Sequence, residues 1–194
     1  MGDVIKIVGS SAHTADEREK NDYYATDPQA LIDFLDQFEK DGESLHVTVW
    51  EPACGEGNLS KVLDKRNHSL LSTDLIERGY GHQFNFLQAQ TPLCWYGDIL
   101  TNPPYKLSEK FVRTALNVVQ DKSKVIMLFK LQFVESSKRF GLFKAFPPKF
   151  IYVHSRRIKI WKNNEDTGSG NALCYAWFVW EKGFKGDTTL RWIP

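Results

Sequence analysis

A short apolar strand that runs directly into two prolines constrains this chain more than any other stretch. Residues 97–101, Gly-Asp-Ile-Leu-Thr, are followed by Asn102, Pro103, Pro104 and Tyr105. Asn102 precedes a proline and is held to extended backbone angles, while the two prolines have a fixed φ and no N–H. No regular element continues through such a sequence. The strand must therefore end in a stiff turn whose carbonyl groups are free to accept hydrogen bonds.

This turn has the composition expected of a site for a flat amine. The side-chain oxygen of Asn102 and the main-chain carbonyl of Pro103 can both accept hydrogen bonds from one planar amino group. The ring of Tyr105 can stack on the aromatic system that carries this group. A proline-rich loop with a buried tyrosine is the plainer interpretation of the same residues. The order and spacing of other motifs must decide between the two.

A glycine turn between a strand and a helix predicts a ligand site earlier in the chain. Residues 46–50 are apolar or β-branched, residues 51–57 read Glu-Pro-Ala-Cys-Gly-Glu-Gly, and a helical pattern follows. Glycines let a backbone turn tightly and approach a ligand closely. A second strand, residues 69–73, ends at Asp74, which follows Glu51 by 23 residues. A carboxylate about 20 residues after such a turn is where doubly wound folds bind ribose hydroxyls, although Asp74 could also cap a helix.

Two of these motifs resemble those of a known enzyme family. Asn102-Pro103-Pro104-Tyr105 resembles the catalytic tetrapeptide of S-adenosylmethionine-dependent amino-methyltransferases, above all the DNA adenine-N6 family. The turn that begins at Glu51 resembles the cofactor motif of the same enzymes. The resemblance covers the chain from Tyr23 to about Trp180, and the small size is similar to that of stand-alone enzymes of phages and mobile elements. It implies S-adenosyl-L-methionine as the cofactor and Asn102, Pro103, Pro104 and Tyr105 as the catalytic residues.

The resemblance also implies a set of cofactor-binding residues. An aromatic-Ala-Thr stretch at residues 24–26 is similar to the motif that lies over the methionine end of the cofactor, unless its tyrosines simply pack at a helix start. Asn85 and Phe86 stand where the family has an acidic residue and a phenylalanine beside the adenine, and a plain loop with buried phenylalanines is equally compatible. The implied residues are Tyr23, Tyr24, Thr26, Glu51, Pro52, Ala53, Gly55, Gly57, Asp74, Asn85, Phe86 and Asn102.

Strands that alternate with helical patterns predict the fold class. We expect an α/β fold with a doubly wound, Rossmann-like methyltransferase sheet that is mostly parallel and has an antiparallel edge strand. A chain of 194 residues is long enough for one sizeable core. We therefore expect a single domain over residues 22–194, with no separate target-recognition domain, after a mobile segment at residues 1–21.

The resemblance implies methyl transfer to the exocyclic N6 amine of adenine in duplex DNA. A base inside a duplex cannot reach such a turn, so it would have to flip out and stack on Tyr105. RNA adenine, cytosine N4 and a protein glutamine amide are alternative targets, because the turn suits any planar amine or amide. A nucleic-acid-binding protein that has kept the fold and lost turnover is a further alternative. The recognition sequence and any partner restriction endonuclease are left open.

Because the net charge of the chain is close to zero, we expect any nucleic-acid contact to come from local basic patches. Lys plus Arg number 25 and Asp plus Glu 24, giving a formal net charge of +1. Basic residues with interleaved apolar ones occur at 155–162, and two more lie at 138–139. Such residues can fix phosphates, although an exposed charged strand would have the same pattern. The candidates are Lys138, Arg139, Arg156, Arg157, Lys159 and Lys162.

The spacing of the cysteines and the hydropathy of the sequence indicate the cellular compartment in which we expect the protein to act. Cys54, Cys94 and Cys174 form no CxxC pair, and no histidines stand at ligand spacing. This pattern argues against a disulfide framework and a zinc site, so we expect no metal and a reducing cytoplasm. The sequence contains no signal-peptide core and no apolar run of membrane length, so we expect no membrane partner.

Overall fold

Apolar runs that end at polar turn residues form the strands of one central sheet. The computed structural model describes residues 24–89, 94–162 and 173–194. The strands in chain order are β2 (Thr48–Glu51), β3 (Ser69–Asp74), β4 (His82–Gln83), β5 (Asp98–Thr101), β6 (Lys124–Lys130), β7 (Phe150–His154), β9 (Tyr175–Glu181) and β10 (Thr189–Ile193). The predicted segment 1–21 and Tyr23 lie outside the described residues.

The sheet is mostly parallel, as the alternation of strands and helices predicts. Its strand order is β10-β7-β9-β6-β5-β2-β3-β4, and each neighbouring pair is parallel except the two that β9 makes. Strand β9 lies between β6 and β7, and β10 forms the rim beside β7. The α/β fold class is confirmed.

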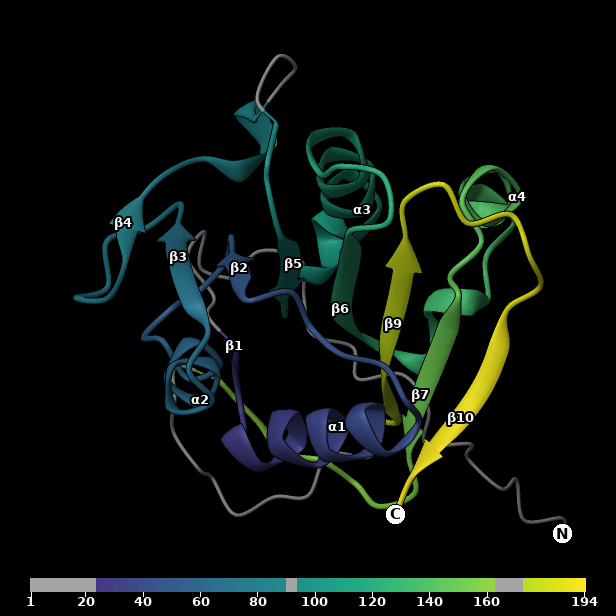
Figure 1. The fold of residues 1–194 in the computed structure, drawn as a ribbon, viewed down its shortest axis with the longest axis horizontal. Coiled ribbons are helices and arrows are strands. Elements are labelled where there is room, and N and C mark those ends of the chain that lie inside the picture. Colours follow the sequence, from purple (N-terminus) through teal and green to yellow (C-terminus); the bar gives the residue numbers. More distant parts are fainter. Residues whose placement is uncertain (1–23, 90–93, 163–172) are drawn as a thin grey trace, which may run out of the picture.

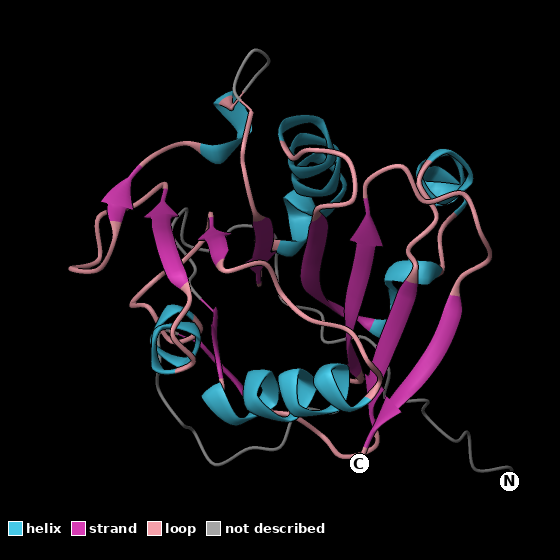
Figure 2. Cartoon of the chain, in the orientation of Figure 1, coloured by secondary structure: helices cyan, strands magenta, loops and turns pink. Residues whose placement is uncertain are grey.

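Helices cover both faces of this sheet. Helix α1 (Pro28–Lys40) starts after Asp27, whose side chain accepts a hydrogen bond from the Gln29 N–H, and Pro28 occupies the first turn. Helices α1 and α2 (Ser60–Lys65) lie on one side of the sheet, and α3 (Ser108–Val118) and α4 (Phe140–Ala145) lie on the other (Figure 1). Figure 2 shows the strands as the middle layer between these helices. The two interfaces form two separate apolar cores.

Two short strands form a second sheet over the first. Strand β1 (Tyr24–Thr26) pairs antiparallel with β8 (Ile160–Lys162), with Tyr24 opposite Lys162 and Thr26 opposite Ile160. The pairing continues beyond β1, because the Asp27 N–H donates to the Lys159 carbonyl at 3.1 Å. This two-stranded ribbon brings the predicted aromatic-Ala-Thr stretch beside the predicted basic segment.

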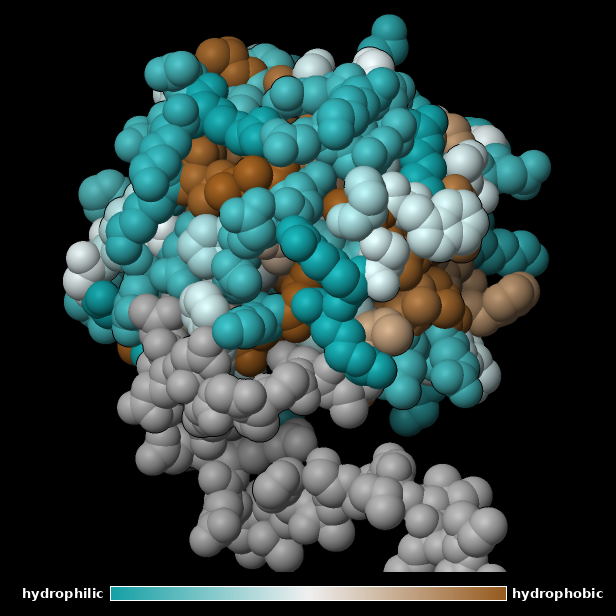
Figure 3. All heavy atoms as spheres, turned by 90° about the horizontal axis from the view of Figure 1, so that it is seen from below, coloured by the Kyte–Doolittle hydropathy of each residue, from teal (hydrophilic) through white to brown (hydrophobic). Residues whose placement is uncertain are grey.

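The surface seen from below the orientation of Figure 1 is largely hydrophilic, with hydrophobic side chains in hollows between the polar ones (Figure 3). Within the described residues, no helix has both the length and the apolar composition needed to cross a membrane.

Candidate active site

Three of the predicted site residues lie at one edge of the sheet, together with Lys130. Glu51 ends β2, Asp74 ends β3, Asn102 follows β5 and Lys130 ends β6. These four parallel strands are consecutive neighbours in the order β3-β2-β5-β6, so their carboxyl ends lie side by side. Ligands of open α/β sheets bind at such ends.

The amide of Asn102 is held in one orientation. Its Nδ2 donates to Thr26 Oγ1 at 2.9 Å and to the main-chain carbonyl of Tyr24 at 3.4 Å. A carbonyl only accepts hydrogen bonds, so the amide nitrogen must face β1 and the oxygen must point away. Asn102 Oδ1 is buried and has no hydrogen-bond partner among the described residues. Because an unsatisfied buried acceptor is costly, this oxygen marks a place where a ligand can donate.

Three tyrosine rings form a cluster at this turn. The rings of Tyr24 and Tyr105 have centroids 6.5 Å apart and planes that differ by 27°, and the ring of Tyr175 lies 6.2 Å from that of Tyr105. Burial, with Tyr175 as the next cause, raises the pKa of Tyr105 well above its usual value. Lys130 Nζ lies 5.5 Å from the centroid of Tyr105, which is within cation–π range. The turn therefore combines a free acceptor with neutral aromatic surfaces.

The glycine turn adopts the conformation that its sequence predicts. Gly55 and Gly57 have φ values of +54° and +81°. A Cβ at Gly57 would lie 2.6 Å from ring atoms of Tyr80, so no larger residue fits there without movement. Tyr80 follows β3, and the sequence reasoning did not identify it. Its position between Gly79 and Gly81 is the feature that could have pointed to it.

Asp74 is tied to the glycine turn. Its Oδ2 accepts from the Gly55 N–H at 2.9 Å, and its Oδ1 accepts from the Ile76 N–H at 3.0 Å. Each carboxylate oxygen has two lone-pair sites, so acceptor capacity remains on both. The structure thus places a half-buried carboxylate with spare acceptors against the glycine turn.

Glu51 is a buried acid at the end of β2. It is 1% exposed, and its Oε2 accepts a hydrogen bond from Ser60 Oγ, which lies 2.6 Å from Ser72 Oγ. Burial raises the pKa of this carboxyl to about 8, and the nearby Asp74 contributes in the same direction. A buried acid in this state favours a neighbouring cation, which would stabilise its charged form. Pro52 is buried beside it, and Ala53 is half-buried against the α3 core.

Asn85 and Phe86 have local structural roles. Asn85 Oδ1 accepts from the Leu87 N–H at 3.2 Å and so caps the short 3₁₀ helix η1 (Phe86–Gln88). Phe86 is 2% exposed, and its ring centroid lies 5.1 Å from those of Trp50 and Phe111. This ring is therefore packed in the apolar core. The role of Asn85 and Phe86 at the cofactor stays a prediction.

Two of the predicted basic residues, Arg139 and Arg156, form polar contacts within the protein. The guanidinium of Arg139 donates to the carbonyls of Gln132, Phe133 and Glu135, and it lies 4.7 Å from the Phe133 ring centroid. Arg139 therefore holds a loop together, a role that the sequence pattern did not reveal. Arg156 forms an ion pair with Asp33 of α1.

The remaining basic candidates are exposed or undescribed. Lys138, Arg157 and Lys159 are exposed, and the side chain of Lys162 lies outside the described part of the chain. Lys159 directly precedes β8, which pairs with β1 beside Asn102. The basic segment is thus close in the fold to the candidate site.

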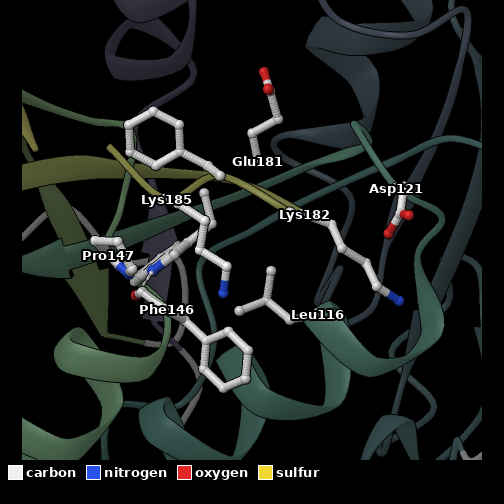
Figure 4. Close-up of a pocket in the computed structure, with 10 residues that line it drawn as sticks. Leu116, Asp121, Phe146, Pro147, Glu181, Lys182 and Lys185 are labelled. Carbon is white, nitrogen blue, oxygen red and sulfur yellow. Dashed lines mark hydrogen bonds between the residues drawn. The ribbon is translucent and has the colours of Figure 1, made fainter. Parts of the chain in front are cut away.

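A separate cavity lies at the opposite edge of the sheet. It has a volume of about 200 Å³ and lies between Leu116, Phe146, Trp180 and Lys185 (Figure 4). Trp180 pairs with Val125 near the start of β6, whereas the candidate site is at the end of β6. The Trp180 indole donates to the Phe146 carbonyl, so this group is already satisfied. In the described ranges, no cluster of three His, Cys, Asp or Glu residues is arranged to hold a metal ion.

The sequence matches no protein-family model and no curated protein. Solved structures share its fold at low sequence identity. A Listeria monocytogenes protein described as a candidate class I S-adenosylmethionine-dependent methyltransferase matches with a TM-score of 0.54 and 11% identity, over 84% of this chain and 63% of its own. A candidate RNA methyltransferase from Pyrococcus horikoshii matches with a TM-score of 0.53 and 14% identity, over 80% of this chain and 83% of its own.

The type IIG restriction endonuclease BpuSI is a third match, with a TM-score of 0.55 and 12% identity, over 80% of this chain and 25% of its own. At these identities the likenesses show the fold, which is the Rossmann-like fold of class I methyltransferases.

Proposed function

We propose that this chain is an S-adenosylmethionine-dependent methyltransferase that methylates the N6 amine of adenine in duplex DNA. The observation that carries the proposal is the unpartnered, buried Oδ1 of Asn102 at the end of β5, next to the ring of Tyr105. A planar amino group can donate to this oxygen while its ring stacks on the tyrosine. The Asn-Pro-Pro-Tyr resemblance and the methyltransferase fold of the structural neighbours support the same chemistry.

The residues at the carboxyl edge fit the proposed cofactor. Gly55 and Gly57 let the backbone approach a ligand, Asp74 has acceptors to spare for ribose hydroxyls, and Glu51 is a buried acid suited to a cationic ligand. When bound, S-adenosylmethionine supplies an activated methyl group on a sulfonium. We propose that these four residues, with the half-buried Ala53 and the buried Pro52, hold it.

Asn102 would act on the amine that accepts the methyl group. The lone pair of an exocyclic amine is delocalised into its ring, which makes the nitrogen a poor nucleophile. An acceptor at Asn102 Oδ1, with the Pro103 carbonyl as a second, favours a pyramidal nitrogen and stabilises its developing positive charge. The amine nitrogen would gain the N–CH₃ bond as the bound cofactor gives up its S–CH₃ bond, and the methylated amine would then lose one proton to solvent. The chain needs no strong base for this step.

Two features favour a nucleic acid as the substrate. The exposed basic residues Lys138, Arg157 and Lys159 include two that lead into β8, and β8 pairs with β1 beside Asn102. The surfaces around the acceptor are aromatic, which suits a flipped base. DNA adenine is preferred over RNA because of the Asn-Pro-Pro-Tyr resemblance. We expect a single domain over residues 22–194 acting in the cytoplasm, where Cys54, Cys94 and Cys174 stay reduced.

The test is transfer of labelled methyl from S-adenosylmethionine to unmethylated duplex DNA, RNA and protein, followed by product analysis. N6-methyladenine in DNA is the expected product. Asn102→Ala should lower kcat by roughly 10²-fold or more, the loss seen when one oriented catalytic donor or acceptor is removed. The affinity for cofactor should change little. Asn117→Ala, on the exposed side of α3, is the matched control and should leave both unchanged.

Two outcomes would contradict the proposal. Methyl label in RNA or protein but not in DNA would move the activity to those substrates. Loss of cofactor binding together with turnover in Asn102→Ala would show that Asn102 serves the cofactor rather than the amine.

A further inference from the structure

We infer that Thr26 is a positioning residue that holds the Asn102 amide with its oxygen directed at the target amine. Thr26 lies on β1, far from Asn102 in the sequence, and its Oγ1 accepts from Asn102 Nδ2 at 2.9 Å. The inference deepens the proposed function and rests on it. It gives Thr26 a role toward the substrate through Asn102, whereas the family resemblance implied a role toward the cofactor.

The contact is built into the fold. Thr26 is 2% exposed, so its hydroxyl is shielded from water. Its carbonyl accepts from Asn58 Nδ2 at 3.4 Å, which ties β1 to the residue after the glycine turn. Strand β1 is also paired with β8, with Thr26 opposite Ile160. Thr26 is therefore held from three sides before any ligand binds.

The orientation matters because the two ends of an asparagine amide have nearly the same shape and opposite hydrogen-bonding character. If the amide turned by 180°, its NH₂ would face the target amine, and two donors would meet where an acceptor is required. The Tyr24 carbonyl can only accept, so it selects the productive orientation, but its contact of 3.4 Å is long. The Thr26 hydroxyl can donate or accept, and its hydrogen bond of 2.9 Å is near the optimal length. Thr26 thus contributes the stronger contact that holds the amide in place, while the Tyr24 carbonyl sets which end faces the target.

Replacement of Thr26 by valine and by serine tests this inference. Thr26→Val keeps the shape and removes the acceptor, so kcat should fall about 10- to 100-fold, as expected when a reacting group loses its alignment. The KM for DNA and the affinity for cofactor should stay within about threefold of wild type. Thr26→Ser restores the hydroxyl and should recover most of kcat. Thr114→Val on α3 is the matched control for a threonine-to-valine change away from the site.

An Asn102→Ala background separates positioning from general damage. Asn102→Ala leaves no amide for Thr26 to hold, so adding Thr26→Val should cost less than threefold there. A second readout does not depend on turnover. The side-chain amide resonances of Asn102 in the free protein, assigned by their loss in Asn102→Ala, should shift in Thr26→Val and return in Thr26→Ser.

Several results would overturn the inference. An unchanged kcat in Thr26→Val would do so. An equal loss in the Asn102→Ala background would also do so, as would a loss that appears only as weaker cofactor binding. If the wild type transfers no methyl group to DNA, RNA or protein, the proposed function fails. The amide resonances then decide about Thr26: no shift in Thr26→Val means that it does not hold Asn102.

Discussion

At the scale of single residues, the candidate site depends on polar groups that the fold leaves in unusual surroundings. Asn102 Oδ1 is buried without a partner among the described residues, and Glu51 is almost fully buried with a single hydroxyl partner for its Oε2. Buried polar groups are normally hydrogen-bonded, and buried acids are normally paired with a cation. An acceptor without a partner at Asn102 and a buried acid without an ion pair among the described residues at Glu51 therefore both indicate a ligand or a function. Both groups lie at carboxyl ends of neighbouring strands, and this shared location is what makes them parts of one site.

Gly57 is predicted to be essential because the backbone and the space around it both require glycine. Gly57→Ala adds a Cβ at φ +81° that meets the Tyr80 ring at 2.6 Å. We expect at least a tenfold loss of cofactor affinity, measured by calorimetry, because the turn must shift. Gly42→Ala is the matched control: it has φ +82° and nothing within 4 Å of the added Cβ. It should cost roughly 1 kcal/mol of stability and leave cofactor binding unchanged.

The double variant Gly57→Ala/Tyr80→Ala separates the clash from the backbone strain. Removing the ring should recover part of the lost affinity if the clash is the cause. Equal effects of Gly57→Ala and Gly42→Ala on cofactor affinity would contradict the prediction.

Residue types at strand ends could be predicted from the sequence, but their contacts could not. The glycine turn, Asp74 and Asn102 are local motifs, and the structure brings all three to one edge. The ring of Tyr80 against Gly57 and the loop held by Arg139 depend on tertiary packing, which no periodicity encodes. The sequence was compatible with Phe86 beside the cofactor or as a buried phenylalanine. The structure packs its ring between Trp50 and Phe111, and its role at the cofactor stays a prediction.

At the scale of elements, the ribbon of β1 and β8 connects the parts of the site. Strand β1 contacts Asn102 through Thr26 and the glycine-turn side through Asn58. Strand β8 brings the basic segment to the same place. The sequence predicted an aromatic-Ala-Thr motif and a basic stretch separately. It could not pair them, because contacts between residues this far apart in the chain leave no local pattern.

Tyr24 is predicted to form the second wall of a slot for the target base. Tyr24 is 42% exposed, and its ring lies 6.5 Å from that of Tyr105 with planes that differ by 27°. Exposed side chains change rotamer readily, so we expect the ring to cover the other face of a base. Base–aromatic stacking is worth about 1–3 kcal/mol per base, so Tyr24→Ala should raise the KM for DNA roughly 5- to 100-fold. Tyr24→Phe should behave like wild type.

Measurement of cofactor affinity distinguishes this role from the one that the family resemblance implied. Tyr24→Ala should bind S-adenosylmethionine as wild type does, and Tyr96→Ala, at an exposed position, is the control. Weaker cofactor binding with an unchanged KM for DNA would favour the cofactor role instead.

At the scale of the whole molecule, the layered architecture followed from the sequence more completely than the strand order did. Alternating strands and helices predict a doubly wound sheet, and the structure has one. The position of β9 between β6 and β7 and the pairing of β10 with β7 depend on how the last third of the chain folds back. In this part of the chain, β7 and β9 are apolar on both faces and β10 lies at the rim of the sheet. The residue pattern of such strands does not specify which strand each one pairs with.

Two buried groups are predicted to give the stability of the molecule opposite responses to pH. Burial lowers the pKa of His154 to about 4, and neither ring nitrogen has a partner in the described ranges. The unfolded chain takes up this proton near its ordinary value of 6.5, so stability falls as pH drops from 6.5 to 4. Glu51 has an ordinary value of 4.5 and a folded pKa of about 8. Its proton is lost first by the unfolded chain, so stability falls as pH rises from 4.5 to 8.

Above pH 6.5 His154 no longer affects the pH dependence of stability, so the effect of Glu51 can be measured there by itself. Between pH 6.5 and 8 the free energy of unfolding should fall by up to about 1.4 kcal/mol per pH unit because of Glu51. Glu51→Gln keeps the shape and the hydrogen bond with Ser60, so urea unfolding of this variant should show a flatter dependence on pH. His154→Phe is the control, since it should change the acid side below pH 6.5 and leave the slope above it unchanged. If the free energy of unfolding depends on pH in the same way for wild type and Glu51→Gln up to pH 8, the prediction is wrong. The Glu51 carboxyl would then already be ionised in the folded chain, and a cationic group of the protein would have to stabilise its charge.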